Sequence, residues 1–314
     1  MKKAVVLLNM GAARSKDELK VFLQNMFNDK NILTIKSDFL RSLIAYFIVT
    51  SRIDSAWENY EAIGGSSPLH DITINLVEKL QNKMSDFFIT EAMRYTSPFA
   101  QTAIARIKEQ NIKDIILLPL YPQYSTTTTK SSVEDFIQKA PSYFNIRVIE
   151  PFYKNKILNK AICDTIVETQ SKYNDFHLIF SAHGLPQKII NKGDPYQKQI
   201  EEHIEILKEK LTHYAVNFKS INLAYQSKVG PMKWLEPSLE DMLKNFKNEK
   251  VIIYPISFLI DNSETIFELD IEYKEIAYNL GIKEYKVCKC LNDSEYLVDL
   301  IENLVEGELD YERE

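Results

Sequence analysis

The chain has 314 residues, of which 45% are hydrophobic and 26% charged, and its formal net charge is −6. This composition is typical of a folded globular protein and excludes intrinsic disorder. The acidic balance, without any basic cluster, argues against nucleic acid as a partner, because phosphate binding requires clustered Lys and Arg. The length favours two domains over one.

Only three cysteines are present, Cys163, Cys288 and Cys290, and they form no regular framework. A low, odd count is typical of a reducing compartment. No stretch approaches the roughly 18 apolar residues of a membrane span. The sequence begins with a strand-like run, which leaves no room for a signal peptide. We therefore expect a cytoplasmic protein.

Short apolar runs alternate with longer segments of helical periodicity along the whole chain. The runs predict strands at residues 4–10, 87–93, 115–120, 146–149, 177–180, 221–224, 251–256 and 285–287. The periodic segments predict helices at residues 16–27, 72–87, 98–110, 158–173, 195–214, 236–246, 264–280 and 295–305. Strict alternation of this kind indicates parallel sheets covered by helices on both faces.

Four β/α units in each half predict an α/β protein of two similar doubly wound, Rossmann-like domains. We place the domains at residues 1–155 and 156–314. The last helical segment, about 295–314, is expected to pack back on the first domain. Ligands of such sheets bind outside the carboxyl ends of the strands, so the loops that follow the strands are the places to look for a site.

One such loop contains Tyr121-Pro122-Gln123-Tyr124-Ser125 and a run of threonines. Two tyrosines and two prolines make a rigid wall with apolar bodies and polar tips. The wall fits a flat aromatic ligand, but on the residues alone a packed turn is favoured.

His183 is the best candidate among the five histidines for a catalytic group. It follows a buried strand and is closed off by Gly184 and Pro186. Groups at the carboxyl end of a strand are well placed for chemistry in α/β enzymes.

Glu264, Glu268 and Glu272 recur at every fourth position of a predicted helix and share one of its faces. Such a row is usually a solvated acidic face. The functional interpretation is a line of oxygen ligands and proton acceptors that leads into a site.

Eight segments of the chain, in order, resemble the ferrochelatase family. They are residues 8–11, 63–69, 93–95, 121–125, 181–186, 191–196, 226–237 and 261–273. One short motif arises easily by chance, whereas eight in order across the chain do not.

The resemblance implies a lyase that inserts Fe²⁺ into protoporphyrin IX, giving protoheme and two protons, as the last step of heme biosynthesis. The porphyrin is expected in a cleft between the two domains. His183 and Glu264 match the catalytic pair and are the expected metal ligands. We assign His183 as the proton acceptor and Glu264 as the metal-side carboxylate, or the reverse. Glu268 and Glu272 match an acidic row that conducts protons or metal.

Further family positions are expected to contact the porphyrin. These are Met10, Arg94, Tyr95, Tyr121, Thr127, Trp234 and Phe258. The family usually has a second histidine where this chain has Asn262, which places any role of that histidine in doubt, because an amide cannot relay a proton at neutral pH. No four-cysteine cluster motif is present, so we expect no iron–sulfur cluster and no cofactor beyond the substrate iron.

Three alternatives stay open. They are iron insertion into coproporphyrin III, cobalt insertion into an early corrinoid precursor, and a tetrapyrrole carrier without catalysis. The Asn9-Met10-Gly11 start resembles the protoporphyrin-using branch. In relatives the segment 39–48 forms an apolar lip at the mouth of the cleft, here with Phe39, Leu40, Leu43, Ile44, Phe47 and Ile48. It is expected to touch a membrane surface or the entering porphyrin, or else to be a helix whose apolar face packs inward. We infer no obligate protein partner.

Overall fold

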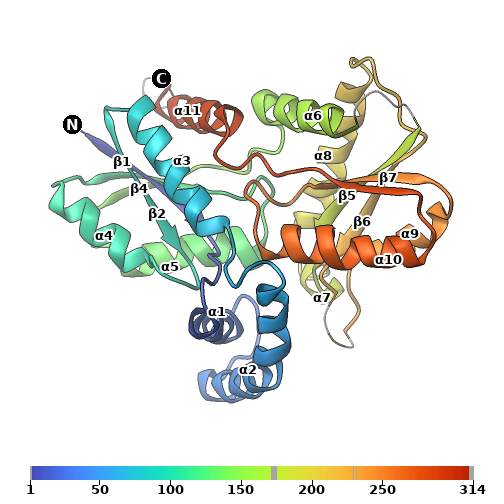
Figure 1. Ribbon diagram of the computed structural model, residues 1–314. Coiled ribbons are helices and arrows are strands. Elements are labelled where there is room, and N and C mark those ends of the chain that lie inside the picture. Colours follow the sequence, from blue (N-terminus) through green and yellow to red (C-terminus); the bar gives the residue numbers. More distant parts are fainter. Residues whose placement is uncertain (1, 171–174, 229, 231, 311–314) are drawn as a thin grey trace. The chain divides into compact units, whose positions relative to one another are not determined.

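The computed structural model describes residues 2–170, 175–228, 230 and 232–310 (Figure 1). These residues form two compact units. Unit 1 contains the chain up to Tyr121, Ser125–Glu150 and the segment from Asp293 onward, and unit 2 contains Pro122–Tyr124 and Pro151–Asn292. Parts of the predicted segments 158–173, 226–237 and 295–314 lie outside the described residues.

Unit 1 contains a parallel sheet of four strands in the order β2-β1-β3-β4. The strands are β1 (Lys3–Asn9), β2 (Phe87–Met93), β3 (Asp114–Pro119) and β4 (Asn145–Val148). The central strand β1 is buried over five successive residues because helices cover both faces of the sheet. Its side chains Ala4, Val6 and Leu8 form one core with residues of β3, α4 and α5.

The helices of unit 1 vary widely in length. They are α1 (Lys16–Asn28), α2 (Asp38–Glu61), α3 (Leu69–Lys83), α4 (Ala100–Glu109), a π-helix η1 (Thr126–Lys130), α5 (Ser131–Lys139) and α11 (Glu295–Asp310). In Figure 1, α4 and α5 cover one face of the sheet, and α3 and α11 lie side by side on the other. Helices α1 and α2 form a hairpin that packs mainly on itself.

Serine caps fix where both helices of this hairpin begin. The Ser15 hydroxyl accepts from the backbone N–H of Glu18, and the Ser37 hydroxyl accepts from that of Leu40. Each cap satisfies one of the free N–H groups of a first helical turn.

Unit 2 repeats the topology of unit 1, with the strand order β6-β5-β7-β8 and all strands parallel. The strands are β5 (Phe176–His183), β6 (Ile221–Gln226), β7 (Lys250–Pro255) and β8 (Glu284–Val287). The helices are α6 (Lys156–Gln170), α7 (Gln187–Ile190), α8 (Tyr196–Leu211), α9 (Leu239–Leu243), a 3₁₀ turn η2 (Lys244–Phe246), a π-helix η3 (Glu264–Glu272) and α10 (Tyr273–Asn279).

The predicted fold class is confirmed, and each of the eight predicted strands overlaps an observed one. The predicted helix 264–280 is instead a π-helix followed by an α-helix. Hydrophobic periodicity failed there because i+4 and i+5 hydrogen bonding bury similar positions over a short segment. No helix in the described part of the chain is long and apolar enough to cross a membrane.

Candidate active site

His183 is the last residue of β5, and its backbone is held from two sides. Its N–H donates to the Ser257 hydroxyl at 3.1 Å, and its carbonyl accepts from the Tyr196 hydroxyl at 3.0 Å. The following Gly184 donates its N–H to the Gln226 carbonyl at the end of β6. A Cβ on Gly184 would lie 2.6 Å from that carbonyl oxygen, so only glycine fits.

The His183 ring is paired with Glu264, the first residue of η3. Its Nδ1 lies 2.8 Å from Oε2 of Glu264, and 36% and 38% of the two side chains are exposed. Because Nδ1 faces a carboxylate, it carries the proton of the neutral imidazole. Within the described residues Nε2 has no hydrogen-bond partner, so it is the nitrogen available to a substrate.

Asn262 fixes the start of η3. Its side-chain oxygen accepts from the backbone N–H of Glu264 at 2.8 Å, and its amide donates to the Ile260 carbonyl. In this chain the residue at the position of the family's second histidine therefore caps the start of a helix.

Ser227 joins Glu264 to Glu268, and the sequence did not predict its role. Its hydroxyl lies 3.1 Å from Oε2 of Glu264 and 2.6 Å from Oε2 of Glu268. Its N–H donates to Oε1 of Glu268 at 2.6 Å, and the Gln226 amide donates to Oε2 at 3.0 Å. Ser227 adopts a left-handed backbone conformation with φ of 64°, which is strained for a residue with a Cβ. The sign of this role that the sequence offered is the position of Ser227 in the segment 226–237, which resembles the ferrochelatase family.

Burial and neighbouring charges shift the pKa values of these side chains, some upward and some downward. Burial lowers the pKa of His183, but the charge and hydrogen bond of Glu264 outweigh it, so that pKa lies above its usual value. Burial raises the pKa of Glu264, but His183 and the Ser227 hydroxyl outweigh it and hold the pKa below its usual value. Burial and repulsion by Glu264 raise the pKa of Glu268 to about 7. Burial also raises the pKa of Glu272.

Two aromatic residues predicted to bind substrate lie beside this cluster. The Phe258 ring packs edge-on against the His183 ring, with a centroid distance of 6.3 Å. Trp234 is half-buried and lies against the loop after His183, where its backbone bridges to Pro186. The structure thus brings His183, Glu264, Glu268, Phe258 and Trp234 together in unit 2.

The other predicted binding residues belong to unit 1, at the carboxyl ends of β1, β2 and β3. Met10 is half-buried and accepts at its carbonyl from the N–H of Tyr95. Tyr121 is buried with its hydroxyl 3.2 Å from that of Ser132, and Thr127 is buried beside Ser125. Arg94 and Tyr95 are engaged in a buried network within the unit.

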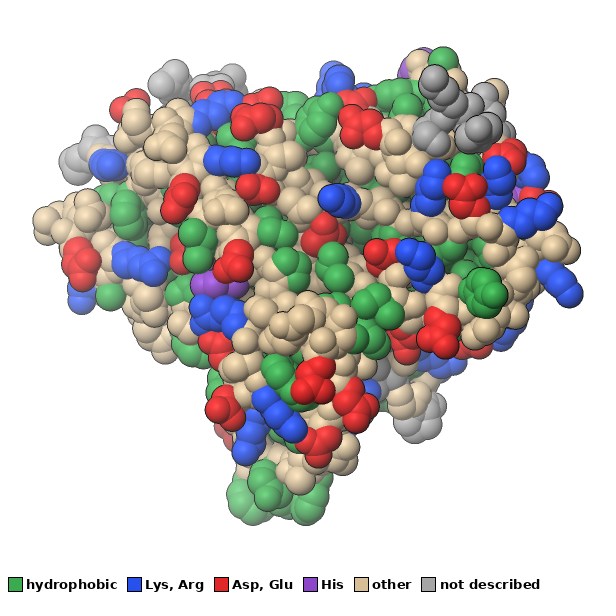
Figure 2. Space-filling model, in the orientation of Figure 1, with side chains coloured by type: hydrophobic (Ala, Val, Ile, Leu, Met, Phe, Trp, Pro, Cys, Tyr) green, Lys and Arg blue, Asp and Glu red, His purple; other side chains and the backbone are tan. Residues whose placement is uncertain are grey.

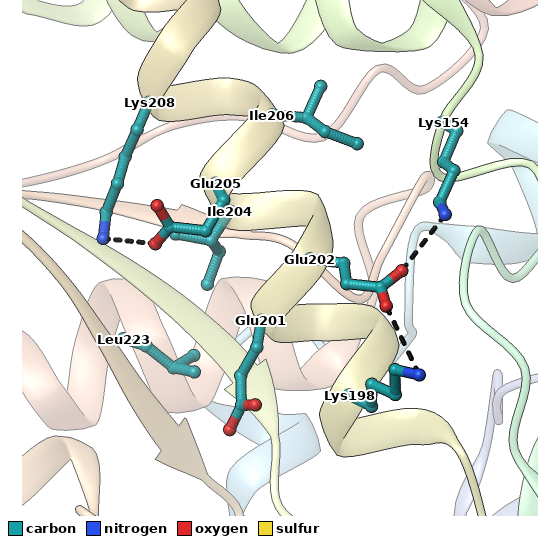
Figure 3. A pocket seen from close by; sticks show the side chains of 9 residues that line it. All are labelled: Lys154, Lys198, Glu201, Glu202, Ile204, Glu205, Ile206, Lys208 and Leu223. Carbon is teal, nitrogen blue, oxygen red and sulfur yellow. Dashed lines mark hydrogen bonds and ion pairs between the residues drawn. The ribbon is translucent and has the colours of Figure 1, made fainter.

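A hollow of about 690 Å³ lies elsewhere, along α8, and Figure 3 shows the side chains that line it. It contains none of the predicted site residues. Its charges neutralise each other, since Glu202 pairs with Lys154 and Lys198, and Glu205 pairs with Lys208. Glu201 also lines the hollow, where its carboxylate accepts from the Gln197 amide at 3.0 Å, and because no predicted site residue is present we do not assign the site to it.

The described residues include no group of three or more His, Cys, Asp or Glu side chains arranged to hold a metal ion. His183 and Glu264 supply one nitrogen and one oxygen donor.

Solved structures define the class of this fold. SirB from Bacillus subtilis with Fe³⁺ aligns with a TM-score of 0.60 at 12% identity, covering 98% of this chain and 95% of that one. CbiX, described as the terminal enzyme of siroheme biosynthesis in denitrifying bacteria, aligns with a TM-score of 0.55 at 11% identity, covering 98% and 99%. At such identities the likeness shows the fold alone, which is that of the chelatases.

The sequence comparisons are more specific. The ferrochelatase family model matches residues 2–309. The ferrochelatase of Sulfurimonas denitrificans is 54% identical over 306 residues, covering 96% of this chain and 97% of the relative. That of Wolinella succinogenes is 50% identical over 315 residues, covering 98% and 100%. The chain belongs to the ferrochelatase family and is a metal chelatase.

Proposed function

We propose that this chain inserts Fe²⁺ into protoporphyrin IX and releases two protons, which gives protoheme in the last step of heme biosynthesis. Membership of the ferrochelatase family supports the reaction. The observation that carries the site is the 2.8 Å contact between Nδ1 of His183 and Glu264, which leaves Nε2 free.

The reaction requires a base because two pyrrole N–H protons must leave as the metal enters. His183 accepts a proton at Nε2, and the adjacent Glu264 carboxylate stabilises the imidazolium that forms. Glu264 also offers a hard oxygen donor to the incoming iron. We assign the role of proton acceptor to His183 and the role of metal ligand to Glu264.

The acidic row provides the next acceptor. Ser227 lies within hydrogen-bond distance of both Glu264 and Glu268, and a carboxyl group with a pKa of about 7 both accepts and releases protons near neutral pH. Glu268 and Glu272 therefore serve as the path for protons or metal.

Porphyrin binding is assigned to loop residues at the strand ends. Met10, Tyr121, Trp234 and Phe258 supply aromatic and apolar contacts and Thr127 a polar one, with Arg94 and Tyr95 nearby in unit 1. Rigid wall contacts favour a bent macrocycle over a flat one, and bending makes the pyrrole nitrogens accessible to metal.

The test is anaerobic metal insertion into protoporphyrin IX by the wild type, His183→Ala and Glu264→Gln. We expect both variants to bind porphyrin but to lose roughly 10²–10⁴-fold in rate, the usual contribution of a positioned base. His177→Ala, at the amino-terminal end of the same strand, is the matched control and should keep its activity.

Porphyrin binding without turnover by the wild type would contradict this function and indicate a carrier. Faster turnover with coproporphyrin III, or with cobalt and a corrinoid precursor, would change the substrate that we propose but not the residues of the site.

We also propose a peripheral membrane contact through the amino-terminal part of α2. Phe39 is 80% exposed and Phe47 62%, and Leu40, Leu43 and Tyr46 are exposed beside them. Figure 2 shows hydrophobic side chains gathered at the tip of the α1–α2 hairpin. Exposed apolar patches of this kind are typical of membrane or protein contacts.

A further inference from the structure

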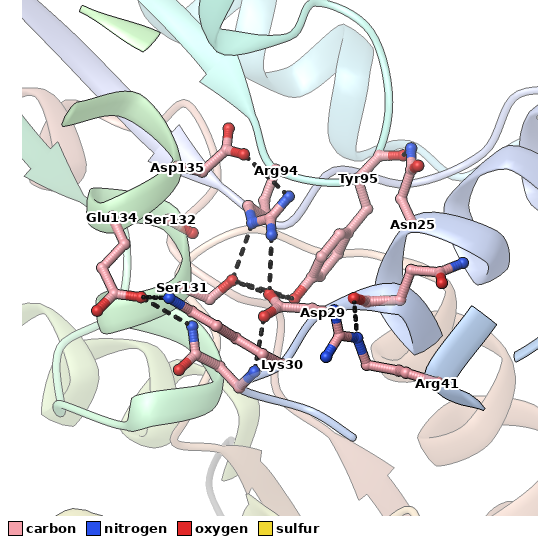
Figure 4. Close-up of polar contacts among 12 residues, drawn as sticks. Asn25, Asp29, Lys30, Arg41, Arg94, Tyr95, Ser131, Ser132, Glu134 and Asp135 are labelled. Atoms are coloured by element: carbon pink, nitrogen blue, oxygen red, sulfur yellow. Dashed lines mark hydrogen bonds and ion pairs between the residues drawn. The ribbon is translucent and has the colours of Figure 1, made fainter. Parts of the chain in front are cut away.

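Asp29 is a buried carboxylate outside the catalytic cluster. It follows the last residue of α1, and its side chain is only 1% exposed. Its Oδ2 accepts from three donors (Figure 4), namely Nη2 of Arg94 at 3.0 Å, the Tyr95 hydroxyl at 2.9 Å and the Ser131 hydroxyl. A buried charge persists only with partners of this kind.

The three donors come from the body of unit 1. Arg94 and Tyr95 directly follow β2, and Ser131 begins α5. The rest of the Arg94 guanidinium is also used, since Nε donates to Ser131 at 2.9 Å and Nη1 lies 3.1 Å from Asp135. Asp29 therefore ties the end of α1 to the loop that follows β2 and to the start of α5.

Tyr95 reinforces the same attachment. It is fully buried, its ring packs edge-on against Phe22 of α1, and its carbonyl accepts from the Asn25 amide at 2.9 Å. The buried side chain of Tyr95 presents no surface to a flat ligand.

Helix α2 is held at this end through α1. Nε of Arg41 donates to the carbonyl of Asn28 at 2.7 Å, and the Ser42 hydroxyl donates to the Asn28 side chain at 2.7 Å. The exposed apolar residues Phe39 and Phe47 lie in this part of α2. The connection at Asp29 is therefore one of the contacts that place these side chains on unit 1.

We propose that Asp29 is a positioning residue that, with Arg94, Tyr95 and Ser131, fixes the α1–α2 hairpin and its apolar tip on unit 1. Arg94 and Tyr95 then act on porphyrin binding through the hairpin and not by touching the ring. This role in binding rests on the proposed function, whereas the attachment of the hairpin does not.

The experiment combines amide hydrogen exchange with iron-insertion kinetics on the full chain. Asp29→Asn keeps the shape but removes the charge that three donors share, and Ser131→Ala is the milder variant should Asp29→Asn fail to fold. Glu91→Gln is the matched control, because Glu91 is also a buried carboxylate paired with an arginine, Arg106, away from the hairpin.

We expect faster exchange over Lys16–Asn28 and Asp38–Glu61, by about tenfold, and unchanged exchange in β1 and β3. The KM for porphyrin should rise about tenfold while kcat stays within about twofold. The control should show neither change.

Unchanged exchange of the hairpin in both Asp29→Asn and Ser131→Ala would overturn the proposal. A rise in KM without faster hairpin exchange would also overturn it, in favour of direct substrate contact. If the wild type lacks iron insertion, the proposed function fails, and the exchange data still decide whether Asp29 holds the hairpin.

Discussion

Gly184 lies between His183 and the end of β6, where the Gln226 carbonyl leaves no room for a side chain. In Gly184→Ala the peptide must shift, and His183 shifts with it. We expect iron insertion to fall about tenfold or more, because small displacements of a catalytic base are costly. Gly307→Ala is the control, since nothing lies within 4 Å of a Cβ at that position. Equal activity of the two variants would contradict this account of Gly184.

Glu268 makes the stability of the fold depend on pH. Its pKa rises from a usual 4.5 to about 7 in the folded protein, so the folded state binds more protons than the unfolded state between these values. Stability is therefore lost as the pH rises from about 4.5 through 7.

Glu268→Gln removes this dependence. We expect the melting temperature of the variant, relative to the wild type, to be higher at pH 8 than at pH 5. Thermal unfolding in matched buffers measures the difference. If the melting temperatures of the variant and the wild type differ by the same amount at pH 5 and pH 8, the pKa of Glu268 is not raised.

Sequence patterns indicated His183 and Glu264 separately, and the resemblance paired them. Ser227 escaped prediction because its function comes from hydrogen bonds to residues 37 and 41 positions away. Nothing in the local sequence reveals such contacts. Asn262 was identified as a departure, but its capping role required the geometry of η3.

The two units share a succession of elements that periodicity did not reveal. In each, the third strand leads into a π-helix, then an α-helix, then the edge strand: β3, η1, α5, β4 and β7, η3, α10, β8. The threonine run of η1 lacks apolar spacing, so the sequence predicted a rigid wall or a packed turn there and no helix. Both π-helices carry predicted site residues, Thr127 and Glu264, in keeping with the frequent occurrence of π-helices at functional sites.

Helix α2 provides a test of the membrane contact. Phe47→Glu places a charge among exposed apolar residues, and we expect co-sedimentation with liposomes to fall severalfold, because inserting a charge into lipid is unfavourable. Tyr278→Glu is the matched control, since Tyr278 is 81% exposed but lies in α10. Equal co-sedimentation of wild type and Phe47→Glu would contradict the proposed membrane contact.

His203 connects distant parts of unit 2. It is fully buried, accepts at Nδ1 from the Gln123 amide at 2.8 Å and donates from Nε2 to Asn159 at 2.7 Å. Burial lowers its pKa from 6.5 to about 3. The unfolded state therefore binds the proton first, and stability is lost as the pH falls from about 6.5 towards 3.

His203→Gln should be less acid-sensitive than the wild type. Between pH 7 and pH 4.5 we expect it to lose about 2–3 kcal/mol less of its unfolding free energy. Urea unfolding at both pH values tests this, with the exposed His213→Gln as control. An equal loss in His203→Gln and the control would refute the linkage.

Most of the fold followed from alternating apolar runs, because buried parallel strands and their covering helices leave strong, regular patterns. No such pattern indicated that Pro122–Tyr124 belong to unit 2. Those residues join unit 2 through single hydrogen bonds, such as that of Gln123 with His203, which no periodicity records.

Helix α11 packs against α3 in unit 1, where Lys83 pairs with Asp299 and Glu302 and where Leu297, Leu300 and Ile301 are buried. During synthesis these residues leave the ribosome after every strand of both sheets. Unit 2 can therefore complete its sheet first, while α3 still exposes the apolar surface that α11 will cover. Nascent chains stalled before Glu295 should thus bind chaperones more strongly than the finished chain does.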